Sequence, residues 1–114
     1  MSNDLGQVLA TLRFDSAGLV PVIVQDNQTG EVLMLAWMNE QAISQTLETR
    51  VATYFSRSRN EIWVKGATSG NFQEVISLSY DCDRDALLLK VNQIGVACHT
   101  GSKTCFDHQV IEMP

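Results

Sequence analysis

Residues 19–37 read LVPVIVQDNQTGEVLMLAW, and this stretch decides the fold. Its two ends, residues 19–25 and 32–37, are rich in β-branched and large apolar side chains, which favour β-strands. Between them, residues 26–30 (DNQTG) are turn-forming. Two strand-like runs on either side of a turn predict a β-hairpin. Pro21 lacks a backbone N–H, so we expect the first strand at a sheet edge, or Pro21 near the start of that strand.

One or two helices are expected outside this hairpin. The first twelve residues carry a weak apolar pattern with helical spacing, which predicts a short helix. Asn39 is a good N-cap residue, and it precedes a helical pattern over residues 40–48. The apolar stripe of this second helix would consist of Ala42, Ile43 and Leu47.

Short strands are expected through the second half of the chain. They are predicted at residues 53–56, 62–65, 74–80, 86–91 and 109–113. Residues 74–80 alternate with a period of two, which assigns Val75 and Ser77 to one face and Ile76 and Leu78 to the other. The pattern predicts an α+β fold: one strand-dominated domain over residues 1–114, with one or two short helices covering a face.

Composition narrows the class of protein. A chain of 114 residues with 45% hydrophobic side chains suits one compact domain with a core. The formal charge of −5 argues against nucleic acid as a partner, because binding the phosphate backbone needs a concentrated positive field. No apolar run approaches the ~20 residues that span a bilayer, and the N-terminus lacks a signal-peptide pattern. We therefore expect a cytoplasmic protein with neither a membrane nor a nucleic-acid partner.

The pentapeptide DCDRD at residues 81–85 is the most unusual in the chain. If the preceding strand continues, Asp81, Asp83 and Asp85 project to one side and Cys82 to the other. Gathered carboxylates repel one another unless a cation lies among them, and oxygen ligands suit Mg²⁺ whereas a thiol suits Zn²⁺. The spacing predicts two different metal sites back to back. The alternative is a solvated acidic turn, with Cys82 in the core.

Residues 95–106 (GVACHTGSKTCF) hold the other two cysteines, Cys98 and Cys105. With Cys82, three thiolates would leave a fourth tetrahedral position for water, which marks a catalytic zinc. His99 is then the candidate general base; as a fourth ligand it would instead close a structural site. If Cys82 faces away from this loop in its own subunit, a dimer interface would complete the ligand set. The alternative is that each cysteine is a small buried residue.

The middle of the chain is basic, since four of the eight Lys and Arg residues fall within residues 50–65. Arg57 and Arg59 would share one strand face, where both can contact phosphate, and Trp63 can stack on a base. A loop rich in glycine and hydroxyl groups follows and offers donors to anions. The candidate substrate-binding residues are Arg57, Arg59, Trp63, Lys65, Thr68 and Ser69. The alternative is a charged strand edge that prevents aggregation.

In this order, these segments resemble the phosphoribosyl-AMP cyclohydrolase family. The motifs that carry the resemblance are YFSRSR at 54–59, WxKGxTSGN at 63–71, DCDxDAL at 81–87, ACHTG at 97–101 and CF at 105–106, together with parts of residues 14–39. The resemblance covers nearly the whole chain from Phe14 onward. Trp37, Val96 and Thr104 stand where the family often has Tyr, Pro and Ser, and none of these departures removes a proposed ligand.

The resemblance implies a small-molecule nucleotide substrate and a reaction of histidine biosynthesis. The N1–C6 bond of 1-(5-phosphoribosyl)-AMP would be hydrolysed, with a zinc-activated water attacking C6 and the adenine ring opening. It also implies a homodimer that binds one zinc ion per subunit and Mg²⁺. The implied ligands are Cys82 of one subunit with Cys98 and Cys105 of the other for zinc, and Asp81, Asp83 and Asp85 for magnesium. Some relatives carry a fused phosphoribosyl-ATP pyrophosphatase domain; this chain stops at Pro114, so we expect that preceding step to belong to another protein.

Three rival interpretations follow from the same residues. A nucleobase deaminase attacks the same carbon, but the His-x-Glu and Pro-Cys-x-x-Cys signatures are missing. A non-catalytic module would use the three cysteines and His99 as a closed structural zinc site. An acidic domain without any metal is the third.

Overall fold

The computed structural model describes residues 5–98 and 100–114, and this part of the chain contains two helices and two β-sheets. The helices are α1 (Leu5–Thr11) and α2 (Glu40–Thr49). The strands are β1 (Val20–Asp26), β2 (Val32–Met38), β3 (Thr53–Ser56), β4 (Glu61–Val64), β5 (Gln73–Tyr80) and β6 (Leu87–Gln93). The predicted strand-dominated α+β fold is confirmed. No described helix is long and apolar enough to cross a membrane.

The hairpin predicted around residues 26–30 is present. Strands β1 and β2 pair antiparallel, with Ile23 opposite Leu35. Asp26 organises the turn: its Oδ2 accepts hydrogen bonds from the Thr29 backbone N–H (2.8 Å) and the Thr29 hydroxyl (2.9 Å). Gly30 adopts φ +77°, a conformation that favours glycine. A side chain that satisfies its own turn explains why this stretch folds as the sequence predicts.

The main sheet has the strand order β2-β1-β6-β5, and β1 runs parallel to β6. Strand β1 is therefore an interior strand, and the expectation of an edge position is wrong. The other expectation for Pro21, a place near the strand start, is confirmed. Pairing with β6 begins only at Val22, so Pro21 is not required to donate to that ladder. Strands β3 and β4 form a separate two-stranded sheet.

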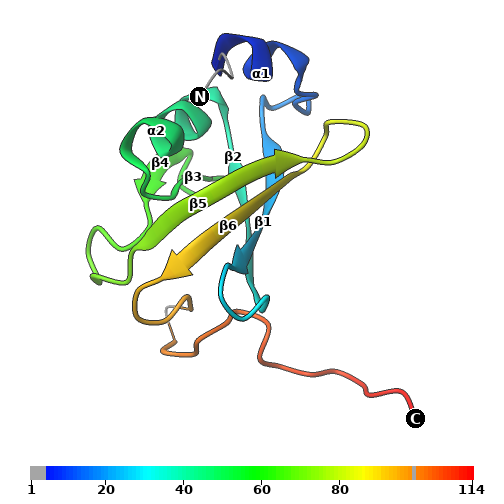
Figure 1. The fold of residues 1–114 in the computed structure, drawn as a ribbon, viewed down its shortest axis with the longest axis vertical. Helices are drawn as coiled ribbons and strands as arrows, with labels where there is room; N and C mark the ends of the chain where they lie inside the picture. Colours follow the sequence, from blue (N-terminus) through cyan, green and yellow to red (C-terminus); the bar gives the residue numbers. More distant parts are fainter. Residues whose placement is uncertain (1–4, 99) are drawn as a thin grey trace.

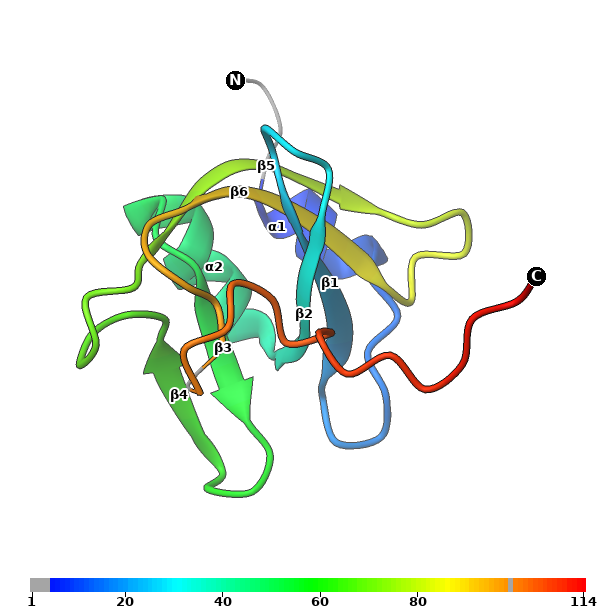
Figure 2. The ribbon, with the colours of Figure 1, turned by 90° about the horizontal axis from the view of Figure 1, so that it is seen from below.

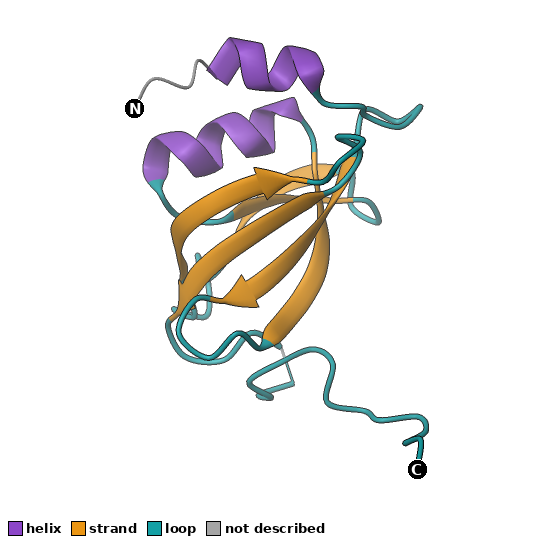
Figure 3. Ribbon diagram, turned by 45° about the vertical axis from the view of Figure 1, so that its right-hand side comes forward, coloured by secondary structure: helices purple, strands orange, loops and turns teal. Residues whose placement is uncertain are grey.

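Both helices lie together over one end of the strands (Figure 3). Helix α2 packs on β2 and β3, and its N-cap is Asn39, whose Oδ1 accepts from the Ala42 N–H at 2.8 Å. The predicted stripe is wrong at Leu47, which is 37% exposed. Thr46 is buried in its place, because its hydroxyl donates to the Thr53 carbonyl (3.0 Å) and accepts from the Thr53 N–H (2.9 Å).

The alternation predicted for residues 74–80 fails because β5 carries a bulge between Val75 and Ser77. Beyond the bulge the faces exchange, so Leu78 packs on the core with Val75 while Ile76 is exposed. The strand also stops at Tyr80. The strand therefore does not continue through residues 81–85, and of the two alternatives for this pentapeptide the acidic turn is present.

Residues 81–86 form the turn between β5 and β6. The Asp81 N–H donates to the Ala86 carbonyl (3.1 Å), and the Arg84 N–H donates to the Asp81 carbonyl (3.0 Å). Arg84 takes φ +64°, which reverses the chain direction. The acidic pentapeptide is thus a hairpin turn.

The last segment differs from the prediction as well. Residues 109–113 form no strand; they run away from the body of the molecule as exposed chain (Figure 1). Val110 is 96% exposed. Within residues 5–98 and 100–114, no strand makes a backbone hydrogen bond to this segment, so it forms no ladder.

Candidate active site

Cys98 and Cys105 lie on one loop, which begins after β6. Inside the loop the Cys98 N–H donates to the Ser102 carbonyl (3.1 Å), and the Gly101 N–H donates back to the Cys98 carbonyl (3.0 Å). Cys105 is fixed separately, since its N–H donates to the Leu33 carbonyl of β2 at 2.7 Å. Figure 2 looks onto this end of the molecule and shows the loop, in orange, running beside β3 and β2. The chain reversal brings the second cysteine back toward the first.

The two thiols are close enough to affect each other. Burial is the largest cause that raises the pKa of Cys105, and the Cys98 thiol raises it further. A hydrogen bond with the Thr100 hydroxyl (Sγ–Oγ1 3.0 Å) lowers the pKa of Cys98. One thiol is therefore poised to ionise before its neighbour, which suits a pair that binds a metal ion as thiolates.

Lys65 is buried beside this thiol pair, with 7% of its surface exposed. Burial lowers the pKa of its ammonium group, while the charges of Cys105 and Cys98 raise it. In residues 5–98 and 100–114 the ammonium group has no hydrogen-bond or ion-pair partner. Most of the Lys65 side chain is buried and its positive charge acts on both thiols, so Lys65 favours negative charge on them.

Cys82 is not part of this cluster within one chain. It is exposed in the β5–β6 turn, whereas the loop of Cys98 and Cys105 leaves the other end of β6 (Figures 1 and 2). Seven strand residues separate the two ends of β6, about 20 Å at ordinary strand rise. The structure thus brings together two of the three predicted zinc ligands. His99, the predicted general base, lies outside the described residues.

The three aspartates of the β5–β6 turn do converge. The carboxylate oxygens of Asp81, Asp83 and Asp85 lie within 4.8 Å of one another, and all three residues are exposed. The turn creates this convergence, not strand alternation. Asp81 Oδ1 accepts from the backbone N–H of Asp85 (3.1 Å) and of Ala86 (3.3 Å).

The pKa values of two of these aspartates move in opposite directions. A hydrogen bond with Asp83 is the largest cause that raises the pKa of Asp85, and the like charges of Asp83 and Asp81 add to it. Desolvation raises the pKa of Asp81, but hydrogen bonds with Asp85 and Asp83 outweigh this effect, so the pKa of Asp81 is lowered. Carboxylates that repel one another in this way are the groups that a hard divalent cation relieves.

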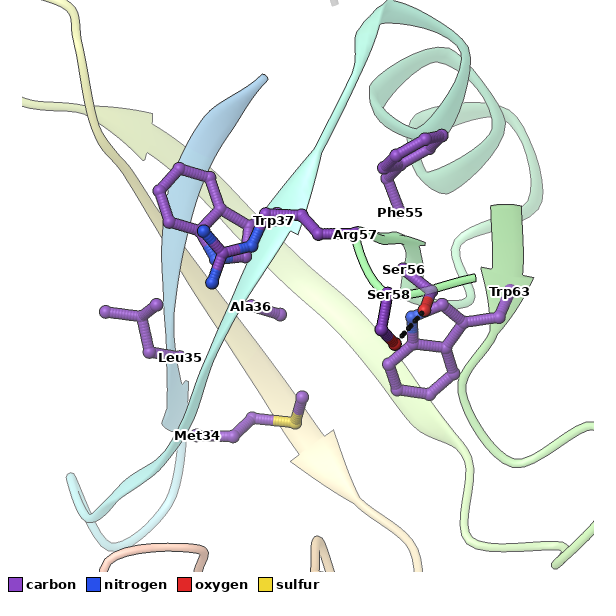
Figure 4. Close-up of a pocket in the computed structure, with 9 residues that line it drawn as sticks. All are labelled: Met34, Leu35, Ala36, Trp37, Phe55, Ser56, Arg57, Ser58 and Trp63. Atoms are coloured by element: carbon purple, nitrogen blue, oxygen red, sulfur yellow. Dashed lines mark hydrogen bonds between the residues drawn. The ribbon is translucent and has the colours of Figure 1, made fainter. Parts of the chain in front are cut away.

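An open pocket of about 510 Å³ lies between β2 and the β3–β4 hairpin (Figure 4). The Arg57 guanidinium stacks over the Trp37 ring, 4.3 Å from its centroid. The hydroxyls of Ser56 and Ser58 stand 3.4 Å apart near Trp63. The lining residues are Met34, Leu35, Ala36, Trp37, Phe55, Ser56, Arg57, Ser58 and Trp63. Aromatic faces beside a fixed guanidinium and hydroxyl groups suit a nucleotide with a phosphate.

Of the predicted substrate-binding residues, Arg57 and Trp63 meet in this pocket and the other four do not line it. Strand β3 ends at Ser56, so Arg57 and Arg59 do not share a strand face as expected. Arg59 is exposed and lies 3.7 Å from Glu61. Thr68 and Ser69 are exposed in the β4–β5 loop.

Sequence reasoning missed the roles of Trp37 and Ser58 in the pocket. The two serines alternate with the arginines in YFSRSR, and this spacing was a signal for hydroxyl donors. Nothing local connects Trp37 to Arg57, because the contact joins β2 to the turn after β3, which lies far from it in the sequence.

The thiol pair and the neighbouring pocket define an enzyme-like site for an anionic, ring-bearing ligand, and the carboxylate cluster lies at the other end of β6. Comparison with known proteins agrees: the family model described as "Phosphoribosyl-AMP cyclohydrolase" matches residues 34–107, a range that contains all three groups. The chain belongs to the phosphoribosyl-AMP cyclohydrolase family, as the sequence motifs predicted.

Curated relatives carry that same name. The chain is 63% identical over 101 residues to the phosphoribosyl-AMP cyclohydrolase of Thermobifida fusca, a match that covers 89% of this chain and 87% of that protein. It is 61% identical over 100 residues to that of Corynebacterium glutamicum, covering 88% and 85%. It is 55% identical over 108 residues to that of Mycobacterium bovis, covering 95% and 94%. At these identities the prediction that the chain is an enzyme is confirmed.

Proposed function

We propose that this protein is a phosphoribosyl-AMP cyclohydrolase of histidine biosynthesis, which hydrolyses the N1–C6 bond of 1-(5-phosphoribosyl)-AMP with zinc. The single observation that carries the proposal is the pair of adjacent thiols, Cys98 and Cys105, beside buried Lys65. This pair and the pocket meet at β2, where Leu33 accepts from Cys105 and Met34 lines the pocket. A metal ion at the thiols would therefore stand near a ligand in the pocket.

The donor set fits zinc. Thiolates are soft ligands that zinc prefers. The positive charge of Lys65 lowers the free-energy cost of ionising two thiols side by side. Zinc, when bound, acidifies a water molecule and supplies hydroxide near neutral pH. Cys98, Cys105 and Cys82 of the partner subunit would hold it. A site completed by a second copy is consistent with the exposed position of Cys82 at the far end of β6.

The chain's own residues would orient the substrate and move protons. Arg57, fixed against Trp37, would bind a 5′-phosphate, and Trp63 would stack on the purine. His99 would accept the proton of the attacking water. Asp81, Asp83 and Asp85 would hold Mg²⁺, whose charge relieves their mutual repulsion. Arg59, Thr68 and Ser69 remain predictions as phosphate ligands.

The first experiment follows absorbance at the wavelength where the opened carboxamide product absorbs. Phosphoribosyl-AMP is mixed with zinc-loaded protein, with chelated protein, and with chelated protein to which zinc is returned. Turnover that the chelator abolishes and zinc restores supports the proposal. No turnover from folded protein supplied with zinc and magnesium would refute it.

The shared site has its own test. Cys82→Ser and Cys98→Ser proteins should each be inactive, because each lacks a ligand in every site. After subunit exchange, a mixed dimer contains one intact site, so an equal mixture should recover about a quarter of the wild-type activity. A mixture that stays inactive after proven exchange would place all ligands of a site on one chain. Ser102→Ala, in the same loop, is the control: it keeps all three cysteines, so it should be active without being mixed with another variant.

A further inference from the structure

The side chain of Gln93, the last residue of β6, links two loops. Its Nε2 lies 3.0 Å from the Ile94 carbonyl, 3.3 Å from that of Phe72, and 3.4 Å from those of Asn71 and Val96. Asn71 and Phe72 belong to the loop before β5, whereas Ile94 and Val96 begin the loop that carries Cys98. One amide group thus donates to the backbone of both segments.

The oxygen of the Gln93 amide accepts a hydrogen bond from a residue of the core. Gln93 Oε1 accepts from Gln73 Nε2 at 2.8 Å, and Gln73 Oε1 in turn accepts a short hydrogen bond from the Tyr54 hydroxyl. Gln73 Nε2 also lies 3.4 Å from Met34 Sδ. Tyr54 and Gln73 are fully buried. All the donors point the same way, from Tyr54 through Gln73 to the loop carbonyls, so each bond polarises and strengthens the next.

Both ends of this chain of hydrogen bonds touch the candidate site. Tyr54 packs against Trp63 of the pocket, with ring centroids 5.2 Å apart. At the other end, Val96 stands two residues before Cys98. The Asn71 side chain lies directly against Gly95 in this segment, since a Cβ on Gly95 would lie 2.0 Å from Asn71 Oδ1. Gln93 thus contacts the segment that leads into the first thiol, where the Ile94 N–H also donates to the Phe72 carbonyl at 2.9 Å.

We infer that Gln93, held by Gln73 and Tyr54, is a positioning residue that fixes the Cys98 loop in the geometry a metal ion requires. The inference rests on the proposed zinc site, since it assigns Gln93 to that site's support. Gln93 touches neither the metal nor the substrate. It acts through the loop backbone, as residues behind metal ligands commonly do. An apolar side chain of the same size would fill the space but leave the loop carbonyls without their common donor.

The test compares Gln93→Met with Asn92→Leu. Both variants keep side-chain size and remove an amide on β6, but Asn92 donates only across the strand pair, to Glu74 Oε1 at 3.0 Å. Zinc affinity is measured by competition with a chromophoric chelator, and the thiolate absorption of the cobalt-substituted protein reports ligand geometry. We expect Gln93→Met to weaken zinc binding about 10- to 100-fold and to alter the cobalt spectrum. Asn92→Leu should leave both unchanged.

A second measurement does not depend on zinc. In metal-free protein, alkylation of each thiol is followed by mass spectrometry, and Cys82, in the distant turn, is the internal control. Gln93→Met should raise the alkylation rate of half-buried Cys98 several-fold and leave that of Cys82 unchanged. Tyr54→Phe, which removes only the far end of the hydrogen-bonded chain, should produce a smaller change in the same direction.

The outcomes separate the two proposals. Wild-type zinc affinity and wild-type Cys98 reactivity in Gln93→Met would overturn the inference, and so would equal losses in Gln93→Met and Asn92→Leu. If the wild-type protein binds no zinc, the proposed function fails. The alkylation rates then still decide whether Gln93 positions the loop.

Discussion

Replacing Gly66 by alanine should destabilise the protein far more than the same change at Gly70 in the same loop. Both glycines have positive φ, +89° and +81°, so both variants carry the cost of a left-handed residue, about 1–2 kcal/mol. The two positions differ in the room available for a Cβ atom. A Cβ on Gly66 would lie 2.6 Å from the Phe72 nitrogen and 2.7 Å from the Asn71 carbonyl carbon, whereas a Cβ on Gly70 meets nothing within 4 Å.

The contacts around Gly66 are with backbone, which cannot rotate away. Relief requires two chain segments to separate by almost an ångström, and strain of this kind costs about 1–3 kcal/mol. We therefore expect Gly66→Ala to lower the free energy of unfolding by about 2–5 kcal/mol, and Gly70→Ala by about 1–2 kcal/mol. For a small domain with roughly 5–15 kcal/mol in total, the first loss is severe.

Urea denaturation of the zinc-free proteins, followed by tryptophan fluorescence, measures the difference. Trp63 is three residues from Gly66 and reports on this region. Gly70→Ala is the matched control for the backbone cost. Equal losses in the two variants would refute the reasoning, because they would mean that the close approach of residues 66 and 72 does not constrain the loop.

Three further predictions concern other parts of the molecule. The hydrogen bond from the Thr29 backbone N–H is the largest cause that holds the pKa of Asp26 below its usual 3.8. The ionised carboxylate therefore stabilises the fold above that pH, and this contribution is lost as the pH falls through the lower folded-state pKa. When the free energy of unfolding is measured from pH 2 to 7, it should fall more steeply with acid in the wild type than in Asp26→Asn. Asn39→Ala should cost about 1 kcal/mol in urea denaturation, and Asn39→Ser should recover most of it, because the cap accepts from the Ala42 N–H. Arg57→Ala should raise KM roughly ten-fold or more through a lost charged hydrogen bond, measured by steady-state kinetics, and should raise it more than Arg59→Ala does, because exposed Arg59 lies outside the pocket. An equal rise in both arginine variants would contradict a pocket centred on Trp37.

Local chemistry explains where sequence reasoning succeeded. The first hairpin and the Asn39 cap each depend on side chains that bond to backbone within a few residues, and both were predicted correctly. Residues 95–106 were also treated as a loop, and the described residues of this segment contain no helix or strand. The convergence of the three aspartates was also expected, but from strand alternation, whereas the structure achieves it through a turn with Arg84 at positive φ.

The remaining errors come from contacts that no local pattern contains. A bulge in β5 moves Ile76 out of the alternation, and only the pairing with β6 reveals it. Thr46 is buried in preference to Leu47 because Thr53, on another element, satisfies its hydroxyl. Lys65 was grouped with the arginines by proximity in sequence, yet it lies beside two thiols that follow more than thirty residues later.

The parallel pairing of β1 with β6 has a consequence for biosynthesis. The β1–β2 hairpin is complete once residue 38 has been made, but the other side of β1 stays unpaired until β6 emerges with residue 93. At roughly 5–20 residues per second, a nascent chain exposes a Val- and Ile-rich strand edge for several seconds. Such an edge is a template for pairing with other chains. A chain that terminates before β6 keeps this edge permanently, so incomplete translation products of this protein should aggregate even though their hairpin has formed.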